Sequence, residues 1–342
     1  MMNSTKPKTP LAWCLKKHPP KLSSTFIATN ITTMIMNMVT APVAIVGNML
    51  ILILIYKYRS LRKPCNILIA SLALSDTLVG LIVQPLLIVR RALDFWQIQY
   101  CFLRFPYVWG SYVLFFLTLS NVALVSIDRY LMIAKPFTYN SIVSTKNYLI
   151  LLVVMWISMN IFINLYCLRI VKKDTYMHLQ SALMFLPLVI IVTFSAIIYW
   201  IAVKQKKKIA AMDKTAALTG KNISKKANSI LIMVLVLLVC YLPQIVLLTY
   251  RGIFGSYIAN YVIPDTWADT LTFVNSAINP FIFCYRIKEF KEALLKLLGR
   301  DSSSSRDEQT HNTLHSNIVL STSGKWLKEA TTTTNIAYSG GA

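Results

Sequence analysis

The sequence predicts an all-α membrane protein, a bundle of seven transmembrane helices followed by a short amphipathic eighth helix. Two observations lead to this prediction. Hydrophobic residues make up 56% of the 342 residues and charged residues only 14%, against about 25% charged in an ordinary soluble domain. Seven apolar stretches also reach the roughly 20 residues that a bilayer-spanning helix needs. A soluble enzyme, a collagen-like fibre and a disordered chain are therefore excluded.

The predicted spans follow one another along most of the chain. They cover residues 34–56, 66–89, 105–127, 148–168, 179–203, 228–250 and 262–285. Residues 1–33 contain no apolar run and are expected to form an extracellular N-terminal segment.

Two segments follow the last span. Residues 286–299 place apolar side chains at helical spacing between lysines, which predicts an amphipathic helix on the membrane surface. The apolar residues are Ile287, Phe290, Leu294 and Leu297. Residues 300–342 are rich in serine and threonine, so they cannot bury a core and are expected to form a disordered cytoplasmic tail.

The distribution of positive charge predicts the orientation in the membrane. The segments after the first, third, fifth and seventh spans carry 4, 3, 8 and 5 Lys or Arg, and the three opposite loops carry 3, 3 and 1. Because cytoplasmic loops carry the excess of Lys and Arg, the C-terminus is expected in the cytoplasm and the N-terminus outside. This asymmetry explains much of the net charge of +22 without nucleic-acid binding. The eight lysines of the third cytoplasmic loop favour contact with anionic lipids or docking of a protein partner.

Sequons and cysteines give weaker signals. Asn3 and Asn30 begin N-glycosylation triplets that fit an outside N-terminus. Six scattered cysteines without a Cys-x-x-Cys pair make a disulfide scaffold or a zinc site unsuitable interpretations.

Polar residues interrupt the apolar spans at several points. Asp76 lies inside the second span, Asn48 inside the first, and Asn275 and Asn279 inside the seventh. An ionisable side chain near the bilayer centre costs about 2.5–3.5 kcal/mol on insertion scales and normally has a partner or a function. One such residue alone would indicate hydrogen bonding between helices. Several on different helices indicate a functional site.

The order of these motifs resembles a known family. The motifs are Gly47-Asn48, Leu72-Ala73-Leu74-Ser75-Asp76, Asp128-Arg129-Tyr130, Trp156, Pro187, Cys240-Tyr241-Leu242-Pro243 and Asn275-Ser276-Ala277-Ile278-Asn279-Pro280. Over residues 34–298 the chain resembles a rhodopsin-like (class A) G protein-coupled receptor. The resemblance implies a receptor, not an enzyme, that transmits binding of an extracellular ligand to a heterotrimeric G protein.

The resemblance also implies a coupling surface. It assigns G-protein coupling to Asp128, Arg129, Tyr130, Pro136 and Phe137, with Arg129 paired to Asp128 at rest. The alternative for Arg129 is an anchor at lipid headgroups. Where many relatives hold this arginine with an acid at the foot of helix six, this chain has none, which predicts a weaker resting clamp.

A sodium site and a switch are implied in the centre of the bundle. The sodium ligands would be Asp76, Thr118, Asn275 and Asn279, since Na⁺ prefers hard oxygen ligands. A purely hydrogen-bonded Asp76 is the alternative, and no other cofactor is expected. The switch residues would be Tyr241, Pro243, Pro280 and Phe283, with Tyr241 and Phe283 departing from the family's usual Trp and Tyr.

The resemblance further implies a disulfide and cytoplasmic partners. The family ties helix three to the second extracellular loop, which suggests Cys101–Cys167, but the spacing departs from the usual one and Cys14 is a competing partner. The tail has 15 Ser or Thr in residues 301–342. Phosphorylation by a receptor kinase would create a site for arrestin, and a merely soluble tail is the alternative.

The ligand pocket is the least defined part. Monoamine receptors of the family have an Asp in helix three where this chain has Ser111, so an ordinary monoamine pocket is not expected. Asp269 in the seventh span is expected near Tyr112, Tyr241 and Gln244, either as the counter-ion of a cationic ligand or paired with Arg104 or Lys173.

A photoreceptor and a transporter are alternatives to a receptor among seven-helix membrane proteins. Phe273 stands where an opsin needs its retinal-binding lysine, which disfavours a photoreceptor. A seven-helix transporter would need internal repeats, and none is visible between the two halves of the chain.

Overall fold

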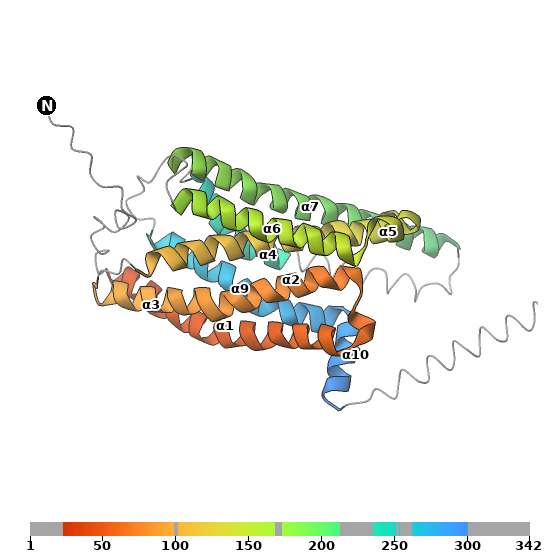
Figure 1. Ribbon diagram of the computed structural model, residues 1–342, viewed down its shortest axis with the longest axis horizontal. Coiled ribbons are helices and arrows are strands. Elements are labelled where there is room, and N and C mark those ends of the chain that lie inside the picture. The colour runs from red at the N-terminus through yellow and green to blue at the C-terminus, as the bar shows by residue number, and fades with distance from the viewer. Residues whose placement is uncertain are drawn as a thin grey trace, which may run out of the picture. The chain divides into compact units, whose positions relative to one another are not determined.

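The computed structural model describes residues 23–98, 102–167, 173–212, 235–250, 253 and 262–299, and the regular elements of these residues are helices. In chain order they are α1 (Ser24–Lys57), α2 (Pro64–Leu78), α3 (Gln84–Phe95), α4 (Arg104–Ala134), α5 (Pro136–Ile142), α6 (Thr145–Cys167), α7 (Lys173–Met212), a helix at Leu235–Tyr250, α9 (Val262–Arg286) and α10 (Lys288–Leu297). The chain divides into two units, Met1–Phe290 and Lys291–Ala342, and α1 to α9 belong to the first. Their long helices run side by side (Figure 1).

The helices occupy the positions of the predicted spans. Five are long and apolar enough to cross a membrane: Ser24–Lys57, Pro64–Phe95, Phe105–Ala134, Thr145–Leu165 and His178–Lys204. The shorter apolar helix Leu235–Tyr250 and α9 lie at the sixth and seventh predicted spans. The span predicted for 105–127 extends to Ala134, so the Asp128-Arg129-Tyr130 motif lies inside α4 and not at its end.

Helix α1 begins at Ser24, well before the span predicted from residue 34. The Ser23 side chain accepts a hydrogen bond from the Phe26 backbone N–H and so caps the first turn. Asn30, Thr33 and Asn37 are buried in this part of the helix. Hydropathy alone excluded Asn30 and Thr33 because their side chains are polar, although they are buried in the bundle. The predicted N-terminal segment 1–33 therefore overlaps the first helix by its last ten residues.

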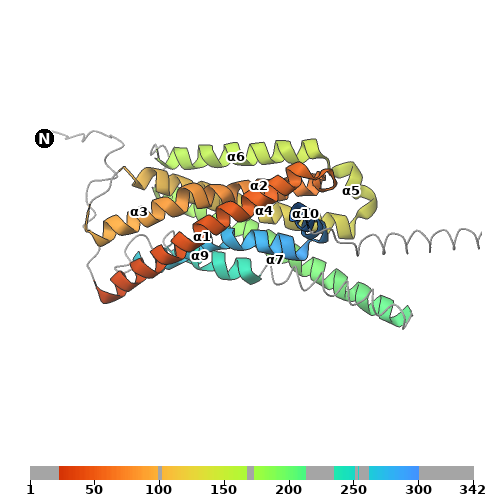
Figure 2. The same cartoon turned by 90° about the horizontal axis from the view of Figure 1, so that it is seen from below.

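Helices α1 and α9 pack closely (Figure 2). A Cβ atom at Gly47 would lie 2.8 Å from Cγ of Pro280, so only glycine permits this approach of the two helices. The next residue, Asn48, donates its amide to the carbonyl oxygen of Ser276 at 2.9 Å. Gly47 and Asn48 therefore set the position of the segment of α9 that carries Ser276, Asn279 and Pro280.

A π-helical turn, Val79–Val83, joins α2 to α3 within one continuous helix, Pro64–Phe95. Such a turn holds one residue more than an α-helical turn, so it rotates the following residues by about 100°. Gln84, the first residue after it, donates to Asn37 Oδ1 at 3.1 Å and to Thr40 Oγ1 at 2.9 Å. The turn therefore decides which side chains of α3 face the bundle.

Helix α4 occupies the middle of the bundle and packs against α2, α6 and α7. Helix α6 lies at the periphery, because only 11% of its most apolar segment, within Thr145–Leu165, is buried. It is fixed to α2 by Trp156, whose indole N–H donates to the Ser71 hydroxyl at 3.4 Å. Polar side chains that serve a common site are thus expected from α2, α3, α4 and α9, which lie further inside.

Candidate functional site

The buried carboxylate of Asp76 in α2 is the centre of a hydrogen-bond cluster that joins three helices. Ser276 of α9 donates its hydroxyl to Oδ1 at 2.8 Å, and Asn279 donates its amide to Oδ2 at 2.7 Å. Thr118 of α4 donates to Oδ1 at the longer distance of 3.3 Å. Both oxygens of this fully buried carboxylate therefore accept hydrogen bonds, which compensate for its removal from water.

The donor set of this cluster fits a sodium ion. A hydroxyl can turn its proton away and present an oxygen lone pair to a cation. Ser276 and Thr118 would in this way join the Asp76 carboxylate as hard oxygen ligands. Asn279 faces the carboxylate with its amide nitrogen and would contribute its oxygen only after rotation.

Asn275, expected among the sodium ligands, does not bond to Asp76. Its buried amide nitrogen has no hydrogen-bond partner among the described residues, and its side chain lies beside Tyr241. Because consecutive residues of an α-helix point about 100° apart, Ser276 reaches the carboxylate instead. Sequence reasoning missed Ser276, although its position one turn before Asn279 puts both on the same face of α9.

A second buried carboxylate, Asp128 of α4, lies near the α5 end of the bundle. Its Oδ1 accepts hydrogen bonds from the phenols of Tyr139, in α5, at 2.8 Å and Tyr148, in α6, at 2.7 Å. Its Oδ2 is buried without a partner among the described residues. Burial and the hydrogen bond to Asp128 raise the pKa of Tyr139 above its ordinary value, so this phenol stays a donor at physiological pH.

The expected ion pair between Asp128 and Arg129 is not formed. Lys63–Glu289 and Arg91–Asp94 are ion pairs among the described residues, but Asp128 and Arg129 do not form one. Arg129, the next residue along α4, points in a different direction and is half-buried. The two tyrosines were missed from the sequence because their reach to Asp128 depends on how α5 and α6 pack against α4.

The remaining coupling residues lie on or beside the same end of α4. The ring of Tyr130 packs against Phe194 of α7, with centroids 5.0 Å apart. Pro136 begins α5, a position where its missing N–H leaves no bond unmade. The side chains of Pro136 and Phe137 lie outside the described residues.

A third group of charged side chains lies where the end of α3, the start of α4 and the first turns of α9 meet. The Tyr107 hydroxyl donates to Asp269 Oδ2 at 2.6 Å, and both side chains are buried. The guanidinium of Arg90 lies 4.7 Å from the centroid of the Tyr107 ring. Arg91, only 1% exposed, donates from Nη1 to Asp94 Oδ2 at 3.5 Å.

Known proteins share this arrangement of sequence motifs. Residues 47–283, which are most of the chain, match the family model described as "7 transmembrane receptor (rhodopsin family)". The chain belongs to this family. The predicted fold, an all-α bundle of seven transmembrane helices, is thereby confirmed, and the protein is a multi-pass membrane receptor and not an enzyme.

Three relatives indicate which receptors of this family the chain is similar to. Trace amine-associated receptor 7d of Mus musculus is 26% identical over 327 residues, which cover 86% of this chain and 83% of that protein. Trace amine-associated receptor 9 of Homo sapiens is 27% identical over 301 residues, 77% of this chain and 85% of that protein. The histamine H2 receptor of Rattus norvegicus is 25% identical over 312 residues, 84% of this chain and 86% of that protein. The receptor is therefore a class A G protein-coupled receptor that responds to an extracellular ligand and acts on a G protein.

The residues predicted for the ligand pocket come from three helices of the receptor. Ser111, Tyr241, Gln244, Asp269 and Phe273 are buried, and Tyr112 is half-buried. The ring of Tyr241 packs against Phe115 of α4 with centroids 5.0 Å apart. The hydroxyl of Ser111 and the amide oxygen of Gln244 have no hydrogen-bond partner among the described residues. Tyr107, which lies one turn before Ser111 on the same face of α4, was missed.

The switch residues also occupy interior positions. Phe283 is buried, and its ring lies 6.5 Å from that of Phe290, centroid to centroid. The helix at Leu235–Tyr250 continues through Pro243, and α9 continues through Pro280.

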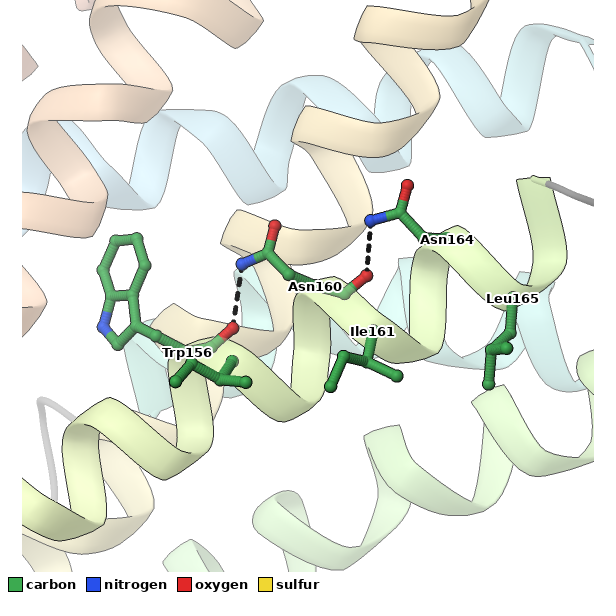
Figure 3. Close-up of a pocket in the computed structure, with 6 residues that line it drawn as sticks. Trp156, Asn160, Ile161, Asn164 and Leu165 are labelled. Atoms are coloured by element: carbon green, nitrogen blue, oxygen red, sulfur yellow. Dashed lines mark hydrogen bonds between the residues drawn. The ribbon is translucent and has the colours of Figure 1, made fainter.

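A groove of about 460 Å³ on α6 lies apart from all three clusters (Figure 3). Its lining residues are Trp156, Ile157, Asn160, Ile161, Asn164 and Leu165. Asn160 and Asn164 each donate their side-chain amide to the backbone carbonyl four residues earlier, both at 2.8 Å. Because these asparagines are satisfied within their own helix, the groove shows no polar group that awaits a ligand.

The modification sites have mixed outcomes. Asn30 is fully buried inside α1, which disfavours a glycan on its side chain. Asn3, Cys14 and Cys101 lie outside the described residues, as does the side chain of Cys167. Cys65, Cys240 and Cys284 are free thiols.

Proposed function

We propose that this receptor binds a ligand with a protonated amine and that Asp269 is the counter-ion of that amine. Two of the relatives are named for trace amines and one for histamine. The acid that monoamine receptors carry in helix three is replaced by Ser111, so an amine would need another anionic partner. Asp269 supplies one from α9.

The surroundings of Asp269 support this role. Asp269 is 9% exposed, and Tyr107 is the hydrogen-bond donor found for it among the described residues, through Oδ2. Arg90 and Arg91 lie within electrostatic range without bonding to this carboxylate, and an ammonium group in contact with it would supply both a charge and hydrogen bonds. The buried rings of Tyr107 and Phe273 would contact the apolar part of the ligand.

Coupling to the G protein is assigned to Asp128, Arg129, Tyr130, Pro136 and Phe137. The half-buried guanidinium of Arg129, which has no ion pair with Asp128, supports this assignment because it remains available for a partner. The lysine-rich loop after α7 would dock the G protein and attract anionic lipids. A receptor kinase and arrestin would act at the Ser/Thr-rich tail, residues 300–342.

The remaining assignments follow the same orientation of the chain. The receptor would lie in the plasma membrane with its N-terminus outside, where Asn3 would be glycosylated. A disulfide would join Cys101 to Cys167 or to Cys14. Residues 286–299 would lie on the cytoplasmic surface of the membrane.

The amine hypothesis is tested with cells that report cyclic AMP and calcium. Tyramine, phenethylamine and histamine are applied to the parent receptor and to Asp269→Asn, which keeps the shape of the side chain and removes its charge. The variant should require at least about tenfold more amine, as expected for the loss of a charge-assisted hydrogen bond. Asp265→Asn is the matched control, since Asp265 lies one turn earlier and is half-buried. Equal amine potency on Asp269→Asn and the parent would contradict the proposal.

A further inference from the structure

The buried arginine Arg91 presents a hydrogen-bonding edge that nothing in the described part of the receptor occupies. Its side chain is 1% exposed, and its Nε and Nη2 atoms are buried without a hydrogen-bond partner. Its one hydrogen bond among the described residues, from Nη1 to Asp94, has a length of 3.5 Å, at the outer limit for a hydrogen bond. Asp94 therefore contacts one corner of the guanidinium, and the opposite edge is buried without an acceptor.

The open edge has a defined chemistry. The Nε–H and Nη2–H bonds of an arginine point the same way, at the spacing of the two oxygens of a carboxylate. A buried donor without an acceptor is costly, and the cost is higher when the group is charged. A group that offers two oxygens and a negative charge would remove this cost. A planar carboxylate fits best.

This edge lies beside the proposed amine site. Arg91 is within electrostatic range of both Tyr107 and Asp269. Tyr107 connects the two parts, because its hydroxyl bonds to Asp269 while its ring faces the guanidinium of Arg90. The buried anion Asp269 on α9 thus contacts this tyrosine, and the buried cation Arg91 on α3 lies within electrostatic range of both.

We propose that the ligand of this receptor is a zwitterion of the amino-acid type, whose carboxylate binds the Nε and Nη2 edge of Arg91 while its ammonium pairs with Asp269. The inference rests on the proposed amine site and adds the second charged group. It assigns specificity to Arg91: amines without a carboxylate leave the buried donors unpaired, and so bind less tightly than their carboxylated counterparts.

The test compares ligands in pairs that differ only in the carboxylate. The pairs are L-phenylalanine and phenethylamine, L-tyrosine and tyramine, and L-histidine and histamine. Glycine, β-alanine and γ-aminobutyrate vary the separation of the two charges, and L-phenylalaninamide keeps the size of the acid without its charge. The measured quantity is the potency ratio of each zwitterion to its amine or amide, because this ratio is independent of how much receptor reaches the cell surface.

On the parent receptor at least one zwitterion should be more potent than its amide or its decarboxylated amine, both of which are cations. Arg91→Lys keeps the positive charge but loses the two-pronged edge, and it should lower this ratio about tenfold. Arg90→Lys is the matched control and should leave the ratio unchanged, since Arg90 faces a ring. Arg91→Gln provides a second variant if the lysine finds a new position.

The outcomes separate this inference from the function on which it rests. If amines activate through Asp269 but no zwitterion is favoured, or if Arg91→Lys leaves the ratio unchanged, the inference is overturned and the amine site stands. If a carboxylic acid without an amine acts through Arg91 and Asp269→Asn has no effect, the amine site is overturned and Arg91 remains an anion site. If no member of any pair acts, both are overturned.

Discussion

The centre of the bundle and its outer end treat buried charge in opposite ways. Around Asp76, donors from α4 and α9 bond to both carboxylate oxygens. At the outer end, Arg91 keeps two buried donors without a partner. The carboxylate of Asp76, which accepts hydrogen bonds at both oxygens from within the chain, joins α2 to α4 and α9. A charged side chain whose hydrogen bonds are incomplete can be stabilised by a bound ligand that supplies the missing acceptors. Under the proposed function, this contrast would distinguish the switch at Asp76 from the recognition site at Asp269 and Arg91.

The largest expected effect extends this comparison to Arg129, a third charged residue. Because Asp128 is held by two phenols, Arg129 is expected to find its partner in the G protein. Arg129→Ala should reach the cell surface normally but lose nearly all agonist-stimulated nucleotide exchange. Reconstituted exchange with purified G protein measures this directly. The same assay on Phe137→Ala should show a loss, since Phe137 is expected to insert an apolar side chain into the G protein. Full exchange by Arg129→Ala would remove Arg129 from the coupling surface.

The second prediction asks whether the hydrogen-bonded centre also holds an ion. If sodium binds at Asp76 and favours the resting state, agonist affinity should fall as NaCl rises. Asp76→Asn removes the charge, so its agonist affinity should not depend on NaCl. Choline chloride at equal concentration controls for ionic strength, which also weakens any attraction at Asp269. The same response to NaCl in variant and parent would leave Asp76 with hydrogen bonding alone.

The third prediction compares two buried asparagines of equal size. Asn48 bonds to the carbonyls of Ala44 and Ser276, whereas both amide atoms of Asn121 are buried without a partner in the described chain. Asn48→Leu should lower the free energy of unfolding by about 1 kcal/mol, the sum of two modest bonds. Asn121→Leu should leave it unchanged or raise it, because it removes an unsatisfied group. Thermal unfolding of the purified receptor measures both, and an equal loss in the two variants would contradict the comparison.

The smallest expected effect concerns the phenols at Asp128. Tyr139→Phe and Tyr148→Phe each remove one hydrogen bond and no ring. Each should change basal nucleotide exchange by about twofold, equivalent to a bond of roughly 0.5 kcal/mol. The change in basal nucleotide exchange should be larger in the double variant than the two single changes combined, since it leaves Oδ1 of Asp128 with neither donor. Strictly additive changes would show that the two phenols act independently.

Hydropathy and motif order were sufficient to predict the helices and the centre of the site. Asp76, Thr118 and Asn279 meet as expected because a membrane span with a polar residue has few ways to satisfy it. The start of α1 was missed because polar residues inside a helix also lower its hydropathy. Asn30, Thr33 and Asn37 lower the hydropathy of a segment whose polar face is turned inward.

The missed site residues depend on packing that no local pattern encodes. Tyr107 reaches Asp269 across 162 positions of the chain, and Tyr148 reaches Asp128 from another helix. The residues that flank these two tyrosines do not distinguish them from tyrosines that face lipid. The open edge of Arg91 was also beyond prediction, because the sequence shows an arginine near the end of a span, where a side chain normally extends to water.

The π-helical turn at Val79–Val83 has a consequence for comparing this receptor with its relatives. A relative with a regular helix here has one residue fewer between its counterpart of Asp76 and the outer end. Residues of α3 that face the bundle interior are then one position out of register with their counterparts when the two sequences are aligned without a gap. Ligand contacts transferred to α3 by counting from Asp76 would fall on Arg90 and miss Arg91. Receptors that share this turn, rather than those with the highest identity, are therefore the proper guides to what this pocket recognises.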